Sequence, residues 1–279
     1  MHEVNIRRHI ESLSLRELSQ RREALSKILS SEGIKYSREG NDRIVNFVFS
    51  SKGNDSGFMF SAHYDNYRDS YGANDNMASV CILIDLCHAL TSKNIHADFV
   101  FTDGEEDKHS GAEFYARTHE LKKYSGIINL DLCGYGDVIV IHGKHKRFTS
   151  RVLMKKHNAE TVKYLPDSDD VIFRKSHVPT ISISIVPKWD VQYLKALASF
   201  GEGLLGRPPE FYMILSDMEV TQTFHNNAKD SPEYVDEHAM MKVYDYFLDA
   251  MTNDERTSKF SFMNLFRNFL ATLVSAVGL

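Results

Sequence analysis

The chain has 279 residues, which is enough to bury the core of one large α/β domain. Its 25% of charged and 42% of hydrophobic residues are ordinary for a soluble globular protein. The net charge of −5 provides no basic field, which argues against nucleic acid as a partner.

The cysteines and the N-terminal residues indicate the cellular compartment of the protein. Cys81, Cys87 and Cys133 lie inside apolar segments and are odd in number, so we expect buried free thiols rather than a disulfide framework. No apolar stretch typical of a signal peptide follows the first eight residues. We therefore expect a cytoplasmic protein.

Helix-like and strand-like segments alternate along the chain. In chain order we predict a helix over 6–31, strands over 43–49 and 57–62, a helix over 77–90, a strand over 97–102, a helix over 110–118, strands over 126–132 and 137–142, a helix over 148–156, a strand over 180–186, and helices over 191–200 and 235–251. This alternation predicts an α/β fold, a three-layer αβα sandwich with a mixed, mostly parallel central sheet. Ligands bind such sheets at the carboxyl ends of the strands.

Five short motifs carry side chains that can bind metal, and each lies where a strand gives way to a loop. They are His63-Tyr64-Asp65, Gly72-Ala73-Asn74-Asp75-Asn76, Asp103-Gly104-Glu105-Glu106, Asn129-Leu130-Asp131 and Thr223-Phe224-His225. Zn²⁺ takes imidazole and carboxylate ligands, and a pair of such ions needs a shared carboxylate. Each motif alone also fits an ordinary surface pair, an Asx turn or a helix cap. The combination in this order is specific.

Two of the motifs carry most of the chemical argument. Glu105 and Glu106 are adjacent on an extended segment and point apart, so one can bind a metal while the other acts as general base. Asp131 lies within an apolar run and would be a buried carboxylate that needs a partner, for which a metal ion is common. Asp65, two residues beyond His63, can accept the second ring N–H of that histidine.

The motif set resembles the co-catalytic, two-zinc aminopeptidase family, which includes bacterial leucyl aminopeptidases, glutamate carboxypeptidase II and, more distantly, glutaminyl cyclases. The resemblance covers roughly residues 57–251 and implies a zinc exopeptidase fold with two divalent metal ions, expected to be zinc. It implies a set of five metal ligands: His63, Asp75, Glu106, Asp131 and His225. Asp75 would bridge the two ions, Glu105 would be the catalytic base, and Asp65 would orient His63. It also makes the Asp75–Asn76 peptide bond a candidate for the cis form.

Some positions depart from the family pattern. Asn74 replaces the first Asp of the bridging motif, which should cost metal binding little, and Ser79 replaces a helix Gly. Asp169 and Asp170 fall on the substrate side, and Asp170 stands at the place of the usual His. An acidic residue there could favour a substrate with a free ammonium group. His109, in contrast, is expected to be an ordinary surface or boundary residue, like most of the 13 histidines.

The resemblance predicts an aminopeptidase that hydrolyses the first peptide bond of peptides with a free N-terminus. Two alternatives stay open. A glutaminyl-cyclase-like acyltransferase would share the fold and typically use one zinc ion. A non-catalytic binding protein would keep the fold and bind no metal.

The predicted organisation is a single zinc-peptidase catalytic domain over residues 1–255, with residues 1–32 forming a helix packed on it. Residues 256–279 carry apolar side chains at helical spacing and predict an amphipathic helical tail. The polar face of this tail is nearly uncharged, which argues against membrane association. We expect the tail to pack on the domain or on a second subunit, and a homodimer is the first choice.

Overall fold

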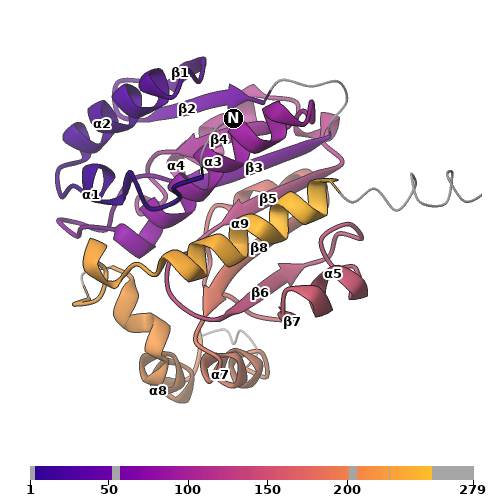
Figure 1. Cartoon of the computed structure of the whole chain (residues 1–279). Coiled ribbons are helices and arrows are strands. Elements are labelled where there is room, and N and C mark those ends of the chain that lie inside the picture. The colour runs from indigo at the N-terminus through magenta and orange to yellow at the C-terminus, as the bar shows by residue number, and fades with distance from the viewer. Residues whose placement is uncertain (1–3, 52–56, 201–205, 226, 253–279) are drawn as a thin grey trace, which may run out of the picture.

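The computed structural model describes residues 4–51, 57–200, 206–225 and 227–252, and its centre is one sheet with helices on both faces (Figure 1). The strands are β1 (Tyr36–Gly40), β2 (Val45–Ser50), β3 (Phe58–His63), β4 (Asp98–Thr102), β5 (Gly126–Leu130), β6 (Val138–Gly143), β7 (Ala159–Val162) and β8 (Thr180–Val186). The α-helices are α1 (Ile10–Leu13), α2 (Leu18–Ser31), α3 (Ala78–Ser92), α4 (Ser110–Thr118), α5 (Arg151–Lys156), α6 (Asp170–Phe173), α7 (Asp190–Leu197), α8 (Pro209–Asp217) and α9 (Glu237–Thr252).

The strands follow the order β1-β2-β4-β3-β5-β8-β6-β7 across the sheet. The four central strands β4, β3, β5 and β8 run parallel, whereas β2 pairs antiparallel with β4 and β6 antiparallel with β8. The predicted αβα sandwich with a mixed, mostly parallel sheet is therefore confirmed. Because the central strands are parallel, the loops after β3, β4 and β5 meet at one edge.

Side chains along β3 divide the core between the two faces of the sheet. Phe58 and Phe60 belong to the core cluster that includes α3 and α9, and the ring of Phe60 lies 5.3 Å from that of Phe247. Met59 belongs to the cluster on the other face, together with Tyr115 of α4. All six residues of β3 are buried, so the strand that ends at His63 is held on both sides.

The predicted helix over 6–31 is in fact two helices, α1 and α2. The main chain leaves the helical path after Leu13, and the carbonyl oxygen of Leu15 accepts a hydrogen bond from Arg21 Nε at 2.7 Å. Arg21 consequently points into the protein and is fully buried. The apolar spacing on each side of this break is helical, so the period alone does not mark where the main chain leaves the helix.

Among the strands and α-helices of the described residues, four have no counterpart in the prediction: β1, β7, α6 and α8. The edge strands β1 and β7 have five and four residues with few buried side chains, so they carry no apolar alternation. The predicted tail over 256–279 lies outside the described residues. Within the described part of the chain, no helix is long and apolar enough to cross a membrane.

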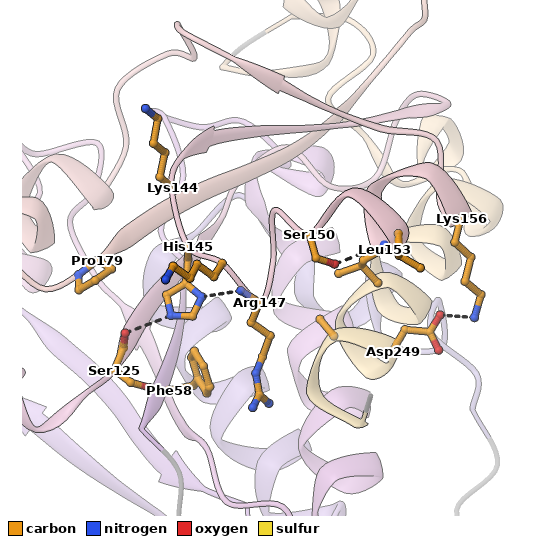
Figure 2. Close-up of a pocket in the computed structure, with 13 residues that line it drawn as sticks. Phe58, Ser125, Lys144, His145, Arg147, Ser150, Leu153, Lys156, Pro179 and Asp249 are labelled. Carbon is orange, nitrogen blue, oxygen red and sulfur yellow. Dashed lines mark hydrogen bonds and ion pairs between the residues drawn. The ribbon is translucent and has the colours of Figure 1, made fainter. Parts of the chain in front are cut away.

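A hollow of about 940 Å³ opens at the amino ends of β3, β5 and β8 (Figure 2). Phe58, Pro179 and the basic side chains of Lys144, Arg147 and Lys156 are among the residues that line it. None of the side chains predicted to bind metal lines this hollow. The predicted site belongs to the opposite, carboxyl edge of the same strands.

Candidate metal centre

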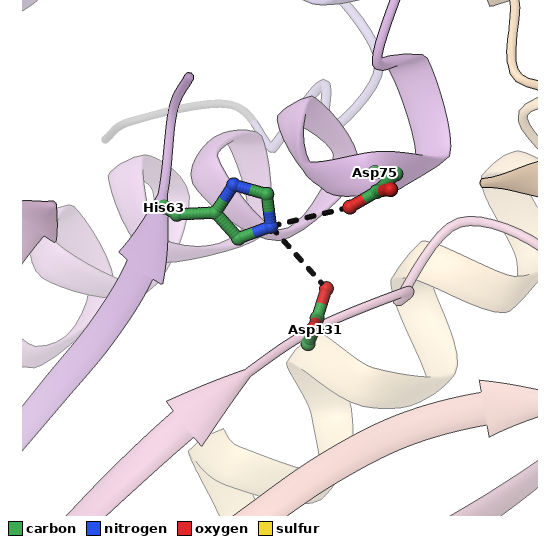
Figure 3. Close-up of side chains that lie close together, drawn as sticks. All are labelled: His63, Asp75 and Asp131. Atoms are coloured by element: carbon green, nitrogen blue, oxygen red, sulfur yellow. Dashed lines mark ion pairs between the residues drawn. The ribbon is translucent and has the colours of Figure 1, made fainter. Parts of the chain in front are cut away.

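Three of the predicted ligands meet at the carboxyl ends of β3 and β5. His63 is the last residue of β3 and Asp131 directly follows β5, which pairs parallel with β3. His63 Nε2 lies 3.2 Å from Asp75 Oδ1 and 3.6 Å from Asp131 Oδ1 (Figure 3). The parallel register of the sheet thus brings together side chains that are 68 residues apart in the sequence, His63 and Asp131.

A second group shares one of these residues. Asp75, Glu106 and His225 each offer a ligand atom, and these atoms lie within 4.8 Å of one another. Glu106 Oε2 is 3.9 Å from His225 Nε2, and the main-chain N–H of His225 donates to Asp75 Oδ2 at 3.0 Å. Asp75 is therefore common to both groups, as expected of a bridging carboxylate.

The spacing of these atoms fits a zinc ion. Ligand atoms at about 2.1 Å from zinc, in tetrahedral arrangement, lie about 3.4 Å from one another. The separations of His63 Nε2 from the two carboxylate oxygens are close to this value. Asp131 Oδ1 is also buried without a hydrogen-bond partner among the described residues. A cation between these atoms would satisfy a carboxylate that is otherwise costly to bury.

Asp65 connects His63, the first predicted ligand, to the glutamate pair. Its Oδ1 lies 3.3 Å from His63 Nδ1, on the side of the ring away from Asp75 and Asp131. The two oxygens of Asp65 also accept the main-chain N–H groups of Glu105 and Glu106, each at 3.1 Å. One carboxylate thus fixes both the imidazole ring and the loop after β4.

Hydrogen bonds from distant segments hold the loop that carries Asp75. The peptide bond between Asp75 and Asn76 is cis, as expected. Asp230 Oδ1 accepts the main-chain N–H groups of Asn74 and Asp75 at 3.0 and 3.2 Å. The Asn74 side chain donates to Thr223 Oγ1 at 2.8 Å and accepts from the main chain of Gly134 at 2.6 Å. The departure at Asn74 therefore joins three loops and does not take part in the ligand groups.

Arg21 is a residue of the site that sequence reasoning missed. Its guanidinium donates to the carbonyl oxygens of Tyr64 and Asp65, at 3.0 and 3.2 Å, and to that of Tyr71. Burial lowers the pKa of Arg21 to about 10, against the opposing effect of Asp230 and other nearby carboxylates. The guanidinium is a fixed positive charge behind the acidic cluster. No motif marks it, because in the sequence it is one arginine of an amphipathic helix.

Burial also shifts the glutamate pair. It raises the pKa of Glu105 to about 7 and that of Glu106 to about 9, with the carboxylate of Asp75 adding to the effect on Glu106. Several acidic side chains thus share a small volume with few cations. Divalent ions would supply the missing positive charge and favour the ionised forms.

The two substrate-side aspartates have different surroundings. Asp170 is buried and forms an ion pair with Arg174, and burial raises its pKa to about 7. Its carboxylate already has a cationic partner, which weakens the argument that it selects a substrate ammonium group. Asp169 is fully buried and accepts a hydrogen bond from Thr102 at the end of β4.

His109, expected to be an ordinary surface or boundary residue, is half-buried and has partners that the sequence does not reveal. Its Nδ1 lies 3.3 Å from Glu105 Oε1 and 3.3 Å from Asp169 Oδ1, and that ring atom is buried. Burial opposes the charged form, but the carboxylates of Asp169 and Glu105 outweigh it and raise the pKa of His109 to about 10. The sequence places His109 in a polar loop, and its partner Asp169 lies in a distant segment. Only the fold brings the two together.

The mixed sheet and the cluster of histidine and carboxylate side chains at its carboxyl edge define an αβα protein with a candidate metal centre. The chain belongs to peptidase family M28, whose family model matches residues 45–251. This match includes all the predicted ligands and confirms the resemblance seen in the motifs. No curated protein matched the sequence.

Solved structures share the fold at low sequence identity. A zinc aminopeptidase from Bacillus subtilis is 18% identical with a TM-score of 0.56, and the match covers 74% of this chain and 49% of that one. A glutaminyl cyclase from Bacteroides thetaiotaomicron is 17% identical with a TM-score of 0.60, covering 90% and 96%. LapB from Legionella pneumophila is 14% identical with a TM-score of 0.61, covering 89% and 71%. The match thus spans about half the length of the Bacillus aminopeptidase and nearly all of the Bacteroides cyclase.

Proposed function

We propose that this chain is a metal-dependent aminopeptidase that holds two divalent ions, expected to be zinc. The observation that carries the proposal is the place of Asp75 in both ligand groups, with His63 and Asp131 on one side and Glu106 and His225 on the other. A shared carboxylate is what two adjacent ions require. Membership of peptidase family M28 and the likeness of the fold to a zinc aminopeptidase support the assignment.

Each residue has a distinct task in the proposed reaction. Bound zinc would supply two effects, a lowered pKa of water and polarisation of the scissile carbonyl. Glu105 would take the proton from the attacking water and return it to the leaving amine. Asp65 would keep the ring of His63 in the tautomer and orientation that present Nε2, and Arg21 would hold the loop behind both.

The test is hydrolysis of a panel of aminoacyl-arylamides by zinc-loaded protein, with N-acetylated analogues as controls. We expect cleavage only of substrates with a free amino group. Glu105→Gln should keep its zinc and lose at least about 100-fold in kcat, the size of effect usual for a general base. Cleavage that survives Glu105→Gln would contradict the assignment of the base.

A glutaminyl-cyclase-like transferase is the second candidate, because the fold covers more of the Bacteroides cyclase than of the Bacillus aminopeptidase. Peptides that begin with Gln distinguish the two reactions, since cyclisation releases ammonia and keeps every peptide bond. Mass spectrometry of such a peptide should show loss of the first residue if the chain is an aminopeptidase. A mass decrease by one ammonia would favour the cyclase.

We also propose a cytoplasmic location and a homodimer for this chain. The three cysteines are free and buried, which supports a reducing compartment such as the cytoplasm. A homodimer through residues 256–279 is supported by the apolar stripe of that segment in the sequence.

A further inference from the structure

The loop between β4 and α4 places His109 against the proposed base. Three nested main-chain hydrogen bonds close this loop: His109 to Glu105 at 3.0 Å, Ser110 to Gly104 at 2.9 Å and Gly111 to Asp103 at 2.8 Å. Lys108 and His109 have φ angles of 60° and 59°, in the left-handed region that residues other than glycine seldom adopt. Such conformations persist where the surroundings fix them, often at functional sites. The loop therefore sets the position of the His109 ring and does not leave it to solvent.

The ring contacts two carboxylates and lies between them. His109 Nδ1 is 3.3 Å from Oε1 of Glu105 and 3.3 Å from Oδ1 of Asp169. His109 Nδ1 and Asp169 Oδ1 are both buried, and neither atom has a hydrogen-bond partner among the described residues. An imidazole N–H is the donor that such carboxylate oxygens lack. The ion-pair contact at 3.3 Å thus offsets part of the cost of burying these two atoms.

Asp169, the other carboxylate that contacts the His109 ring, is held by the sheet. Asp169 is fully buried, and its other oxygen accepts a hydrogen bond from Thr102, the last residue of β4. A continuous series of contacts therefore runs from Thr102 through Asp169 and His109 to Glu105. Glu105 itself has a long side chain with several rotatable bonds, and its side chain is only 11% exposed. Because a long side chain can adopt many rotamers, the orientation of the Glu105 carboxylate depends on the side chains that contact it inside the site.

We propose that His109 is a positioning residue, which holds the carboxylate of Glu105 in the orientation for proton transfer while Asp169 holds the imidazole ring. The role of Glu105 in this inference rests on the proposed function. A base displaced by about 1 Å can lose on the order of 100-fold in rate. The loss should appear in kcat, because neither His109 nor Asp169 belongs to the groups that could bind metal.

The first test compares two substitutions of the same histidine in zinc-loaded protein. His109→Leu removes the donor, and we expect kcat on an aminoacyl-arylamide to fall about 10- to 100-fold with KM and zinc content within twofold. His109→Asn places an amide nitrogen near the position of Nδ1 and should restore most of kcat. His119→Leu is the matched control: this histidine, at the other end of α4, pairs with Glu39 at 3.2 Å, and its loss should leave kcat unchanged.

The second test asks whether the effect passes through Glu105. In a Glu105→Gln background, His109→Leu should cause no further loss of kcat, because the group that it positions is already gone. An equal loss in both backgrounds would overturn the proposal, as would loss of zinc or failure of His109→Asn to restore kcat. These outcomes would assign His109 a general role in folding or in metal binding.

A readout that needs no turnover separates this inference from the proposed function. If the wild-type chain hydrolyses no aminoacyl substrate, the proposed function fails, and the contact is tested by NMR of protein labelled with ¹⁵N-histidine. We expect a His109 Nδ1–H resonance that shifts on both Glu105→Gln and Asp169→Asn. A resonance that neither substitution moves would overturn the inference.

Discussion

At the scale of single residues, the site depends on buried polar groups that satisfy one another across long distances in the sequence. Asp65 accepts hydrogen bonds from the loop after β4, and Asp230 accepts hydrogen bonds from the loop that carries Asp75. Arg21 donates to the main chain of Tyr64, which directly follows His63. The predicted ligands are thereby held by side chains that do not belong to the candidate ligand groups themselves. Removing one such group should leave its partners buried and unsatisfied, which costs more than the lost contact.

Arg21 provides the strongest case for this cost. Arg21→Met should lower the free energy of unfolding by about 3–5 kcal/mol, because several buried carbonyl oxygens would lose their donor and the acidic cluster would lose a fixed positive charge. Urea unfolding measures this change. Arg117→Met is the control, since Arg117 forms an exposed pair with Glu113, and it should cost less than about 1 kcal/mol. Equal effects of the two substitutions would contradict the structural role of Arg21.

The order of the motifs predicted the candidate ligands that the structure brings together, whereas no motif pointed to Arg21 or His109. A histidine or carboxylate directly after a buried strand can be placed from the sequence at the carboxyl edge of the sheet, because the carboxyl ends of parallel strands meet there. Arg21 lies in a helix and contacts carbonyl oxygens 43 and 44 residues away. The partners of such a residue depend on how the helix docks, and no local pattern records that docking.

At the scale of elements, β6 carries a histidine whose charge is disfavoured by the fold. Burial lowers the pKa of His142 to about 4, and the neighbouring Arg174, whose guanidinium is 3.0 Å from Nδ1, adds to this effect, while Asp167 opposes it. The folded pKa is below the ordinary value of 6.5. As the pH falls from about 6.5 to 4, the unfolded chain therefore takes up a proton that the folded chain does not, and stability decreases.

His142→Gln should remove this part of the pH dependence. Between pH 7.5 and 4.5 we expect the wild-type chain to lose about 1–2 kcal/mol more stability than the variant, after allowance for the partial exposure of the ring. Urea unfolding of both proteins in the presence of a chelator measures the difference without a contribution from bound metal. Parallel curves for the two proteins would show that His142 stays free to ionise in the folded state.

The elements themselves were predicted well where apolar periods are long and poorly where they are short. The strand over 180–186 and the helix over 110–118 have the predicted bounds. Every residue of this strand is buried, and the helix buries Gly111, Ala112 and Tyr115. The edge strands β1 and β7 have few buried residues and were missed. The apolar pattern that predicts an element reflects its buried side chains. A strand at the edge of the sheet buries few side chains and therefore shows little of this pattern.

At the scale of the whole molecule, assembly is the open prediction. If residues 256–279 hold two chains together, sedimentation velocity at micromolar concentration should show a dimer for the full chain and a monomer for a chain that ends at residue 255. The physical reason is the apolar stripe of this segment, which a second copy could cover. A full chain that sediments as a monomer would contradict the prediction.

The central claim is that one carboxylate, Asp75, joins two metal ions in a peptidase of family M28. Equilibrium dialysis against zinc, followed by metal analysis, tests it most directly. We predict two zinc ions per chain in the wild-type protein, two in Glu105→Gln, and loss of zinc in Asp75→Ala, because both groups use that residue. One ion per wild-type chain, or full occupancy of Asp75→Ala, would contradict the account.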